Sequence, residues 1–519
     1  MAPRGTLRFA AFALVAVVVL SGFAYNALVS RSPLAGVDYF SPASEVEILA
    51  LDHPNFADIR KYERTLPQHR LPTFMTKTRP RYVYFSNEAW GTGWNNVFQE
   101  QLINTHLAYL AHRGYVFPDY IARDHPPFPD ALPNGTRHML HIPMNAFTSG
   151  PTGGGELGAG ADPHSPRAIS LEWWDAVCPR AQVVEVTVAD VVRELGITET
   201  STGEERLMRW AAKLRDMKAE CVTVIGGSPF DYMCARLLPR LPFLTSTSFV
   251  GSDRVVALWP SYGHSPTLTQ HAWSALITRA LSRNFALFSA ADMPAALAPS
   301  FISRITAATG AGSIAEPYPL TAFTPLRTDA PPIAGLLGLH VRRGDFAEHC
   351  TSLAGWGSDY NAWNVFGRPD IAAAGAGRYP ALPDHLIVPA GTARGDAAYA
   401  HCWPTPAAIV ARAREVRTAA ASGEAFPAQA LQSVYIATNG EPEWVRALAL
   451  LLQEDGWGAV KSSCDMRLAR DEFAVAQAVD MAALVAAETF IGVGFSSLSS
   501  NVVQLRLAGG RHAATNRFW

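Results

Sequence analysis

Two neighbouring arginines in the sequence His-Val-Arg-Arg-Gly-Asp, residues 340–345, have the chemistry to bind an anion. They follow an apolar run, residues 333–341, that is typical of a strand buried on both faces of a parallel sheet. Because side chains alternate along a strand, we expect His340 and Arg342 on one face and Arg343 on the other.

Arg342 is therefore the candidate for the anion. An arginine at the carboxyl end of a strand, beside a glycine such as Gly344, can donate two parallel hydrogen bonds to a diphosphate. The alternative is a plain surface turn in which Asp345 pairs with an arginine.

A serine-rich loop forms a second candidate segment. Residues 494–500 read Gly-Phe-Ser-Ser-Leu-Ser-Ser and lie between a predicted strand, 489–493, and a predicted helix, 501–507. Hydroxyl and backbone N–H groups at such a helix start bind phosphate. The alternative is simple helix capping by Ser499 or Ser500.

Two more polar residues accompany these segments. Thr438 follows a predicted strand, residues 434–437, in the place equivalent to the serine loop. Asp480 lies in an apolar, helix-like stretch, residues 471–487. Each also has a purely structural interpretation, helix capping for Thr438 and a cap or solvated face for Asp480.

A glycine-containing loop occurs near the other end of the chain. Residues 91–96, Gly-Thr-Gly-Trp-Asn-Asn, follow a predicted strand, 81–86, and precede a predicted helix, 97–113, with Asn95 or Asn96 as its cap. This loop matches neither a Walker A sequence nor the dinucleotide-binding glycine pattern.

Strand, loop and helix thus succeed each other in both halves of the chain, which predicts an α/β fold of two Rossmann-like, doubly wound domains facing across a cleft. The ligand belongs at the carboxyl ends of the strands. The predicted organisation is a tail and anchor at residues 1–30, a stem at 31–80, a first domain with a loop-rich insertion at 81–330 and a second at 331–519.

Bulk properties and missing motifs exclude several classes of protein. The 519 residues carry a net charge of −2 without a basic block, so binding to nucleic acid is not expected. The sequence has no Asp-x-Asp pair to hold Mg²⁺ or Mn²⁺, and arginine and helix-start donors would take the place of a metal. It also lacks the serine hydrolase elbow and the zinc protease motif.

The amino terminus predicts a membrane anchor. Residues 9–29 are apolar and long enough to cross a bilayer. Arg4 and Arg8 precede the run and Arg31 follows it, which favours a type II anchor with the remaining chain in the lumen of the Golgi or endoplasmic reticulum. A cleaved signal peptide is the alternative, and it leads to the same compartment.

Two further features suit a lumenal protein. Asn134 begins an Asn-Gly-Thr glycosylation sequon. The six cysteines are an even number without a Cys-x-x-Cys pair, which favours disulfides over zinc, although their pairing stays open. Cys350 and Cys402 bracket one long insertion that a disulfide between them could close.

Assembled in order, these segments resemble the GDP-fucose protein O-fucosyltransferase superfamily, which includes the α-1,6-fucosyltransferases. The matching segments span most of residues 81–507. They are residues 340–346 followed by Cys350, 435–439, Asp480 through 490–492, 495–497, and the Gly-x-x-Asn loop at 93–96.

The resemblance implies a GT-B-like enzyme that transfers fucose from GDP-fucose to a protein hydroxyl or a glycan, with inversion and without metal or other cofactor. Arg342 would bind the β-phosphate, His340 and Asp345 would line the nucleotide or sugar, and Asp480 would hold the guanosine. Ser496 and Ser497 would hold the diphosphate. The predicted substrate-binding set also includes Gly93, Asn95, Asn96, Arg343, Thr438 and Phe495.

The catalytic base and the exact donor stay open. An inverting displacement needs a group that activates the acceptor hydroxyl, and Glu88, Asp345 and Glu348 are candidates. Asn439 stands where the superfamily commonly has an acidic residue, and Trp94 enlarges the usual loop. Transfer from another GDP-sugar and a non-catalytic lumenal sugar-binding protein are therefore alternative hypotheses.

Overall fold

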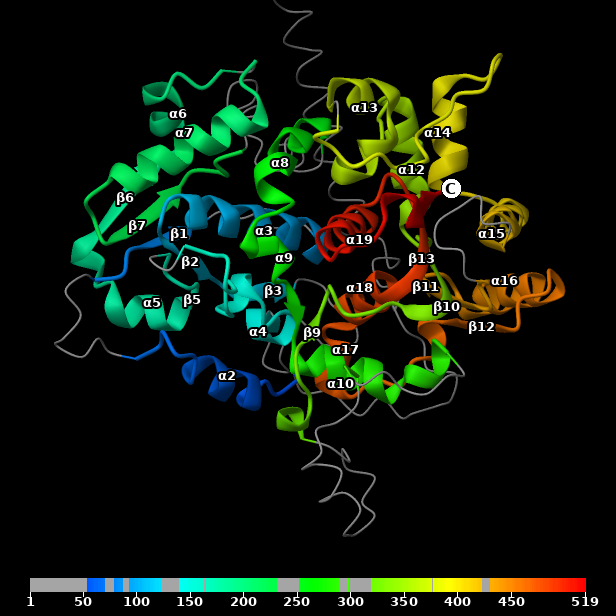
Figure 1. Cartoon of the computed structure of the whole chain (residues 1–519), viewed down its shortest axis with the longest axis horizontal. Helices are drawn as coiled ribbons and strands as arrows, with labels where there is room; N and C mark the ends of the chain where they lie inside the picture. The colour runs from blue at the N-terminus through cyan, green and yellow to red at the C-terminus, as the bar shows by residue number, and fades with distance from the viewer. Residues whose placement is uncertain are drawn as a thin grey trace, which may run out of the picture. The chain divides into compact units, whose positions relative to one another are not determined.

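The computed structural model describes residues 54–70, 79–86, 93–122, 140–162, 165–198, 200–230, 252–289, 296–297, 319–375, 377–421 and 430–519 (Figure 1). All of them belong to one unit, residues 40–519. The predicted anchor at residues 9–29, Glu88 and Asn134 lie outside the described ranges. Within those ranges, no helix has both the length and the apolar character needed to span a bilayer.

The first sheet is parallel and is built from the amino-terminal half. Its five strands follow the order β5-β2-β1-β7-β6. Their bounds are β1 Tyr82–Phe85, β2 Gly114–Phe117, β5 Ile169–Ser170, β6 Val183–Thr187 and β7 Cys221–Ile225. The helices connecting them include α3 (Trp94–Leu110), α5 (Leu171–Val177), α6 (Val188–Glu194) and α7 (Gly203–Asp216).

The second sheet is also parallel, with the order β12-β11-β10-β13-β14. Its strands are β10 Ile333–Val341, β11 Ser433–Thr438, β12 Ala459–Ser462, β13 Ala487–Gly492 and β14 Asn516–Phe518. The first strand along the chain, β10, is central, and the chain extends the sheet first to one side of it and then to the other. The strand order therefore reverses between β10 and β13, which is where doubly wound sheets bind ligands.

Helices cover both faces of this second sheet. Helix α18 (Ala476–Ala486) contacts β10, β11 and β13, and α19 (Ser497–Ala508) packs beside it. Helices α15 (Pro406–Ala421) and α16 (Pro442–Glu454) lie on the other side (Figure 1). Pro442 occupies the first turn of α16, where its missing N–H is not needed.

A middle segment connects the two sheets along the chain. It contains η4 (Asp253–Leu258), α8 (Trp259–Tyr262), α9 (Pro266–Thr269), β8 (Ala272–Trp273) and α10 (Ala275–Arg283). Arg279 of α10 donates to Asp471 at 2.9 Å and to the buried Glu472 at 2.7 Å, both in α17 (Arg470–Phe473). The Tyr262 hydroxyl donates to Gln504 Oε1 of α19 at 2.9 Å. Polar contacts thus tie the middle segment to the second sheet.

The expectation of an α/β protein with parallel sheets is confirmed. The predicted strand at 333–341 is β10, and the strands predicted at 434–437 and 489–493 are β11 and β13 with slightly different ends. Helix α19 begins at Ser497 instead of residue 501. Part of the predicted stem is folded, because α2 (Ala57–Arg64) packs Ile59 into the core. The domain boundaries stay a prediction.

Two disulfides occur among the described residues. Cys350 pairs with Cys402, which closes the insertion that these two residues bracket, and Cys178 pairs with Cys221; the sequence had left the pairing open. Cys464 is unpaired, and Cys234 lies outside the described ranges.

Candidate functional site

The two arginines that follow β10 have different surroundings. The Arg342 side chain is 26% exposed, and its Nη2 donates to Asp345 Oδ1 at 2.8 Å. Arg343 is only 6% exposed. Arg342 is therefore the one that can reach a ligand in solution.

Arg343 has an interior role. Its guanidinium lies between the rings of Trp403 and Trp444, 4.4 Å from each centroid. It donates to the Arg342 carbonyl at 3.1 Å and to the Pro404 carbonyl. Burial lowers the pKa of Arg343 to about 10, so the group stays charged at neutral pH. These contacts fix the backbone next to Arg342.

The turn after the arginines depends on Gly344 and Asn439. Gly344 has a φ of +63°, and a Cβ at this position would lie 2.9 Å from Asn439 Nδ2. Asn439 Oδ1 accepts from the Arg343 N–H at 2.8 Å, while its Nδ2 donates to Asp345 Oδ1 at 3.5 Å. A carboxylate at position 439 has no hydrogen to donate and would repel Asp345, which explains why an asparagine suits this position.

His340 points into the protein. Its Nδ1 lies 2.9 Å from Ser499 Oγ of α19, and its backbone carbonyl accepts from Trp519 Nε1 at 3.0 Å. Burial, with a smaller contribution from the charge of Arg342, lowers the pKa of His340 to about 3. The imidazole is thus neutral and holds α19 against β10, and its predicted contact with nucleotide or sugar stays a prediction.

The serine loop starts α19 at the carboxyl end of β13. Ser496 is the N-cap, because its Oγ accepts from the Leu498 N–H at 3.3 Å. Ser497 is the first helical residue and is partly exposed. Ser499 and Ser500 lie inside the helix, so neither caps it. Phe495, which precedes the N-cap, packs against Tyr360 with 5.2 Å between ring centroids.

Thr438 and Asp480 belong to one buried network. Thr438 Oγ1 donates to the Val341 carbonyl at 2.6 Å, and the Thr438 N–H donates to Ser463 Oγ at 3.1 Å. Ser463 Oγ donates to Asp480 Oδ2 at 2.9 Å, and the Tyr435 hydroxyl donates to Oδ1 at 2.6 Å.

The Asp480 side chain faces the interior, with 0% exposure. Burial raises the pKa of Asp480 to about 7, against the opposing effect of its two hydroxyl donors. In this arrangement the carboxyl supports the ends of β10 and β11. Its contact with a guanosine stays a prediction.

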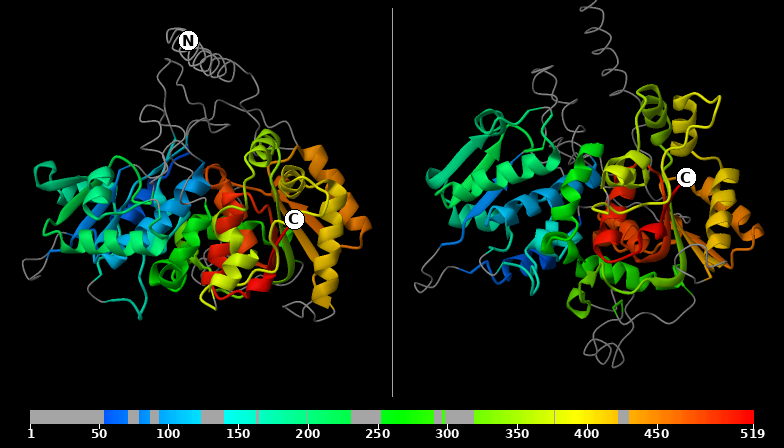
Figure 2. Two further views of the ribbon diagram at one scale, coloured as in Figure 1. Left: turned by 90° about the horizontal axis from the view of Figure 1, so that it is seen from above. Right: turned by 45° about the horizontal axis from the view of Figure 1, so that its top comes forward.

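The first turn of α3 lies beside the same helices. Asn95 Nδ2 donates to Gln477 Oε1 of α18 at 3.2 Å, and Asn501 Nδ2 of α19 donates to the Asn95 carbonyl at 2.8 Å. Gly93 precedes α3 and is exposed, while Asn96 is half-buried. Figures 1 and 2 show the blue α3 next to the red α19. Segments from opposite ends of the sequence are thus brought together.

These positions define a polar edge at the switch point of the second sheet. Arg342 and Ser497 are partly exposed where the neighbouring strands β10 and β13 end, whereas His340, Arg343, Thr438 and Asp480 are buried behind them. The Asp345 side chain is 71% exposed, and an ion pair of this kind contributes about 0–1 kcal/mol. An incoming phosphate can therefore replace Asp345 on Arg342 at little cost.

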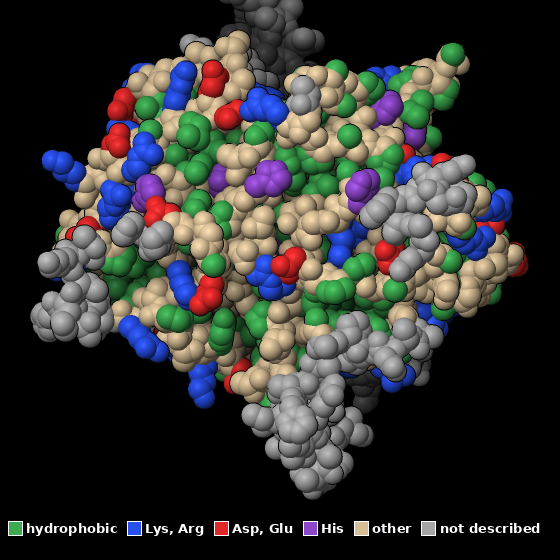
Figure 3. All heavy atoms as spheres, viewed as in Figure 1, with side chains coloured by type: hydrophobic (Ala, Val, Ile, Leu, Met, Phe, Trp, Pro, Cys, Tyr) green, Lys and Arg blue, Asp and Glu red, His purple; other side chains and the backbone are tan. Residues whose placement is uncertain are grey.

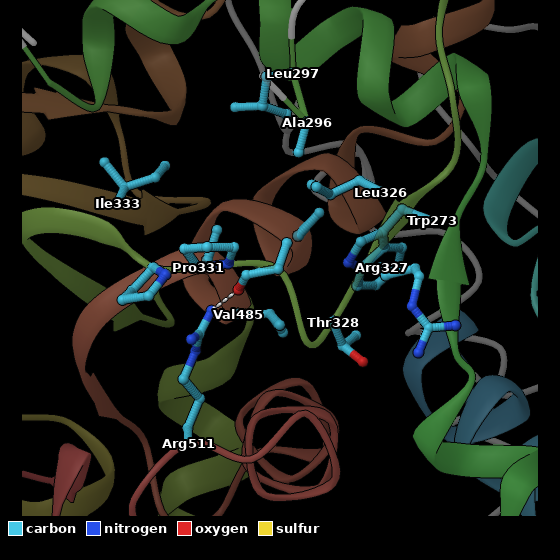
Figure 4. Close-up of a pocket in the computed structure, with 14 residues that line it drawn as sticks. Trp273, Ala296, Leu297, Leu326, Arg327, Thr328, Pro331, Ile333, Val485 and Arg511 are labelled. Carbon is cyan, nitrogen blue, oxygen red and sulfur yellow. Dashed lines mark hydrogen bonds between the residues drawn. The ribbon is translucent and has the colours of Figure 1, made fainter. Parts of the chain in front are cut away.

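A separate pocket lies at the opposite end of the sheet (Figure 4). Its volume is about 280 Å³, and its lining is mostly apolar, including Trp273, Leu326, Ile333 and Val485. Ile333 is the first residue of β10, whereas Arg342 follows the last. The pocket is therefore distinct from the polar edge.

The charged side chains of the described residues bear on whether they form a second cluster. On the face seen in Figure 3, basic and acidic side chains are intermingled. Among the residues that the structure describes, no group of three or more His, Cys, Asp or Glu side chains is placed to hold a metal ion.

Several residues that position this edge were not found by sequence reasoning. They are Trp403, Trp444, Trp519 and Asn364, the last of which donates to the Gly494 carbonyl at 2.8 Å. The one available signal was the position of Trp403 next to Cys402.

The fold and the polar edge define an α/β protein whose doubly wound sheet carries a partly exposed arginine at its switch point. No family model matches the chain, and no curated protein matches it.

Similar solved structures include crystal structures of POFUT1, a GDP-fucose protein O-fucosyltransferase. The complex of POFUT1 with GDP has a TM-score of 0.45 and 14% sequence identity, covering 85% of this chain and 99% of that chain. The complex with GDP-fucose has a TM-score of 0.45 and 13% identity, covering 84% and 98%.

Proposed function

We propose that this chain is a glycosyltransferase that moves fucose from GDP-fucose to a protein hydroxyl or a glycan, with inversion and without a metal. The observation that carries the proposal is the partly exposed guanidinium of Arg342, which directly follows β10. The neighbouring strand β13 leads into the amino terminus of α19, so both lie on strands that meet at the switch point of a doubly wound sheet. The choice of GDP-fucose rests on the resemblance of residues 340–346 and 495–497 to the O-fucosyltransferase superfamily.

The chemistry requires a place for negative charge. An acceptor oxygen attacks C1 of the sugar, the bond from C1 to the β-phosphate oxygen breaks, and GDP leaves with the electron pair. Arg342 and the N–H groups at the start of α19 would stabilise the leaving diphosphate, a contribution of about 3–4 kcal/mol for one well-placed donor.

The acceptor proton needs a base. Inversion requires this base to act from the face of the sugar opposite the leaving diphosphate. Asp345 starts on the diphosphate side, paired with Arg342, so it can serve only after a bound phosphate has released it to turn toward the acceptor. Glu348, in the first turn of α12 (Phe346–Gly355), and Glu88 are the other candidates. Each candidate can be replaced by its amide, glutamine or asparagine. The base is the residue whose variant loses transfer but still binds GDP.

We also propose that the chain works in the lumen of the Golgi or endoplasmic reticulum, anchored by residues 9–29. The two disulfides fit an oxidising compartment. Protection of an epitope at the carboxyl terminus from protease in sealed microsomes would support this topology, and its digestion would contradict it.

The test is an assay of donor hydrolysis by the purified full-length chain with GDP-fucose, GDP-mannose and UDP-sugars, combined with calorimetric titration of GDP. Hydrolysis of GDP-fucose supports the proposal. Preferential hydrolysis of GDP-mannose would identify GDP-mannose as the donor instead. GDP binding without hydrolysis or transfer indicates a non-catalytic sugar-binding protein. Absence of GDP binding overturns the proposal.

A further inference from the structure

The Cys350–Cys402 disulfide closes a segment that touches both loops of the polar edge. It joins α12, which directly follows the arginine turn, to the end of α14 (Arg394–Cys402). Both cysteines are fully buried. We call residues 350–404 the closing segment.

One end of the closing segment holds the arginine turn. Trp403 directly follows Cys402, and its ring lies 4.4 Å from the Arg343 guanidinium. The next residue, Pro404, accepts a hydrogen bond from Arg343 through its carbonyl. Arg343 in turn donates to the carbonyl of Arg342. The disulfide is thus two residues away from the contacts that fix the backbone of Arg342.

Residues 361–364 of the closing segment hold the serine loop. The Asn361 N–H donates to the Gly494 carbonyl at 2.8 Å, and Asn364 Nδ2 donates to the carbonyls of Gly494 at 2.8 Å and Ser496 at 3.3 Å. The Trp363 N–H donates to Ser500 Oγ at 3.3 Å.

The closing segment also packs closely against the serine loop. Tyr360 packs so near the loop that a Cβ on Gly494 would lie 2.4 Å from its ring. The Asn364 side chain is fully buried, so its amide is committed to the loop.

We propose that the closing segment positions the arginine turn and the serine loop relative to each other, with Trp403 and Asn364 as positioning residues for the bound diphosphate. The two loops end different strands, and the closing segment makes hydrogen bonds to both. Breaking the disulfide loosens Trp403 and Pro404 first, and through them the Arg342 backbone. This inference rests on the proposed function, since it concerns how the same site holds GDP.

The experiment compares two disulfide variants of the full-length chain by calorimetric titration with GDP and with guanosine. The test variant is Cys350→Ser/Cys402→Ser, and the control is Cys178→Ser/Cys221→Ser, at the end of α5 and the start of β7. The sequence separations are 52 and 43 residues, so loss of loop-closure entropy destabilises the two variants almost equally.

We expect the test variant to bind GDP about tenfold more weakly than the wild type, and the control to bind within about twofold of it. Guanosine, which lacks phosphates, should bind both variants and the wild type equally. Equal loss of GDP affinity in both disulfide variants overturns the inference, as does an unchanged affinity in the test variant.

A pair of asparagine variants keeps the inference testable if the cysteine variants do not fold. Asn364→Ala removes two side-chain hydrogen bonds to the serine loop, whereas Asn361→Ala keeps the backbone bond that Asn361 contributes. We expect weaker GDP binding only for Asn364→Ala. Equal GDP affinities of the two asparagine variants would overturn the inference. A wild type that does not bind GDP instead refutes the proposed function.

Discussion

Replacing Arg342 by alanine separates a ligand contact from a structural one. In the free protein the side chain forms one exposed ion pair, with Asp345, and lies 5.7 Å from the Phe346 ring centroid. An exposed pair contributes about 0–1 kcal/mol, so Arg342→Ala should change the free energy of unfolding by no more than about 1 kcal/mol.

The effect on transfer should be much larger. Loss of a donor aimed at the leaving diphosphate costs about 3–4 kcal/mol of transition-state stabilisation, which is roughly two to three orders of magnitude in rate. The assay is kcat/KM for GDP-fucose hydrolysis, measured beside urea unfolding of the same preparation.

Arg343→Ala is the matched variant and should lose mainly stability, with a smaller loss of turnover because the Arg342 backbone loses its support. It removes two cation–π contacts and leaves the carbonyls of Arg342 and Pro404 without their donor, a loss of about 3–5 kcal/mol in the free energy of unfolding. Arg342→Lys keeps the charge without the planar fork and should recover only part of the rate. A destabilised Arg342→Ala, or one with wild-type turnover, would refute the assignment of Arg342 as the diphosphate donor.

Two further predictions concern the buried support of the edge. Burial raises the pKa of Asp480 from 3.8 to about 7, so the folded chain binds more protons than the unfolded chain between about pH 4 and 7, and stability falls as pH rises through that window. In urea titrations, the unfolding free energy of Asp480→Asn should therefore rise relative to that of the wild type between pH 4 and 7. A difference between the two proteins that does not change with pH would contradict a raised pKa for the buried Asp480 carboxyl. Trp519→Phe leaves the His340 carbonyl without its donor, at a cost of about 1–3 kcal/mol in unfolding free energy, and an unchanged unfolding midpoint would contradict that contact.

Three of the five strands of the second sheet, β10, β11 and β13, were predicted from their apolar runs, whereas β12 and β14 were not. A nine-residue apolar run such as β10 can be satisfied only by burial on both faces. The start of α19 was not readable, because Ser497, Ser499 and Ser500 are poor interior helix residues. The His340 imidazole and the Trp363 N–H bind two of these serines inside the helix.

The site was readable only in part. Alternation along β10 predicted that Arg342 and Arg343 point to opposite faces of the sheet. The strand ends at Val341, however, so alternation does not determine the surroundings of either arginine. What buries Arg343 is a pair of tryptophans from distant positions, Trp403 and Trp444. Asp480 resembles a ligand residue by its motif, yet its partners, Tyr435 and Ser463, become evident only once α18 is packed on β11.

The central claim is that Arg342 binds the β-phosphate of a guanine nucleotide, and a thermodynamic cycle tests it most directly. Calorimetric titrations of wild-type chain and Arg342→Ala with GDP and GMP give four affinities, which isolate the coupling between the guanidinium and the β-phosphate. We predict that GDP binds the wild type at least about tenfold more tightly than GMP, and that this difference is much smaller in Arg342→Ala, where only the start of α19 still contacts the β-phosphate. An equal preference for GDP over GMP in both proteins would contradict the claim.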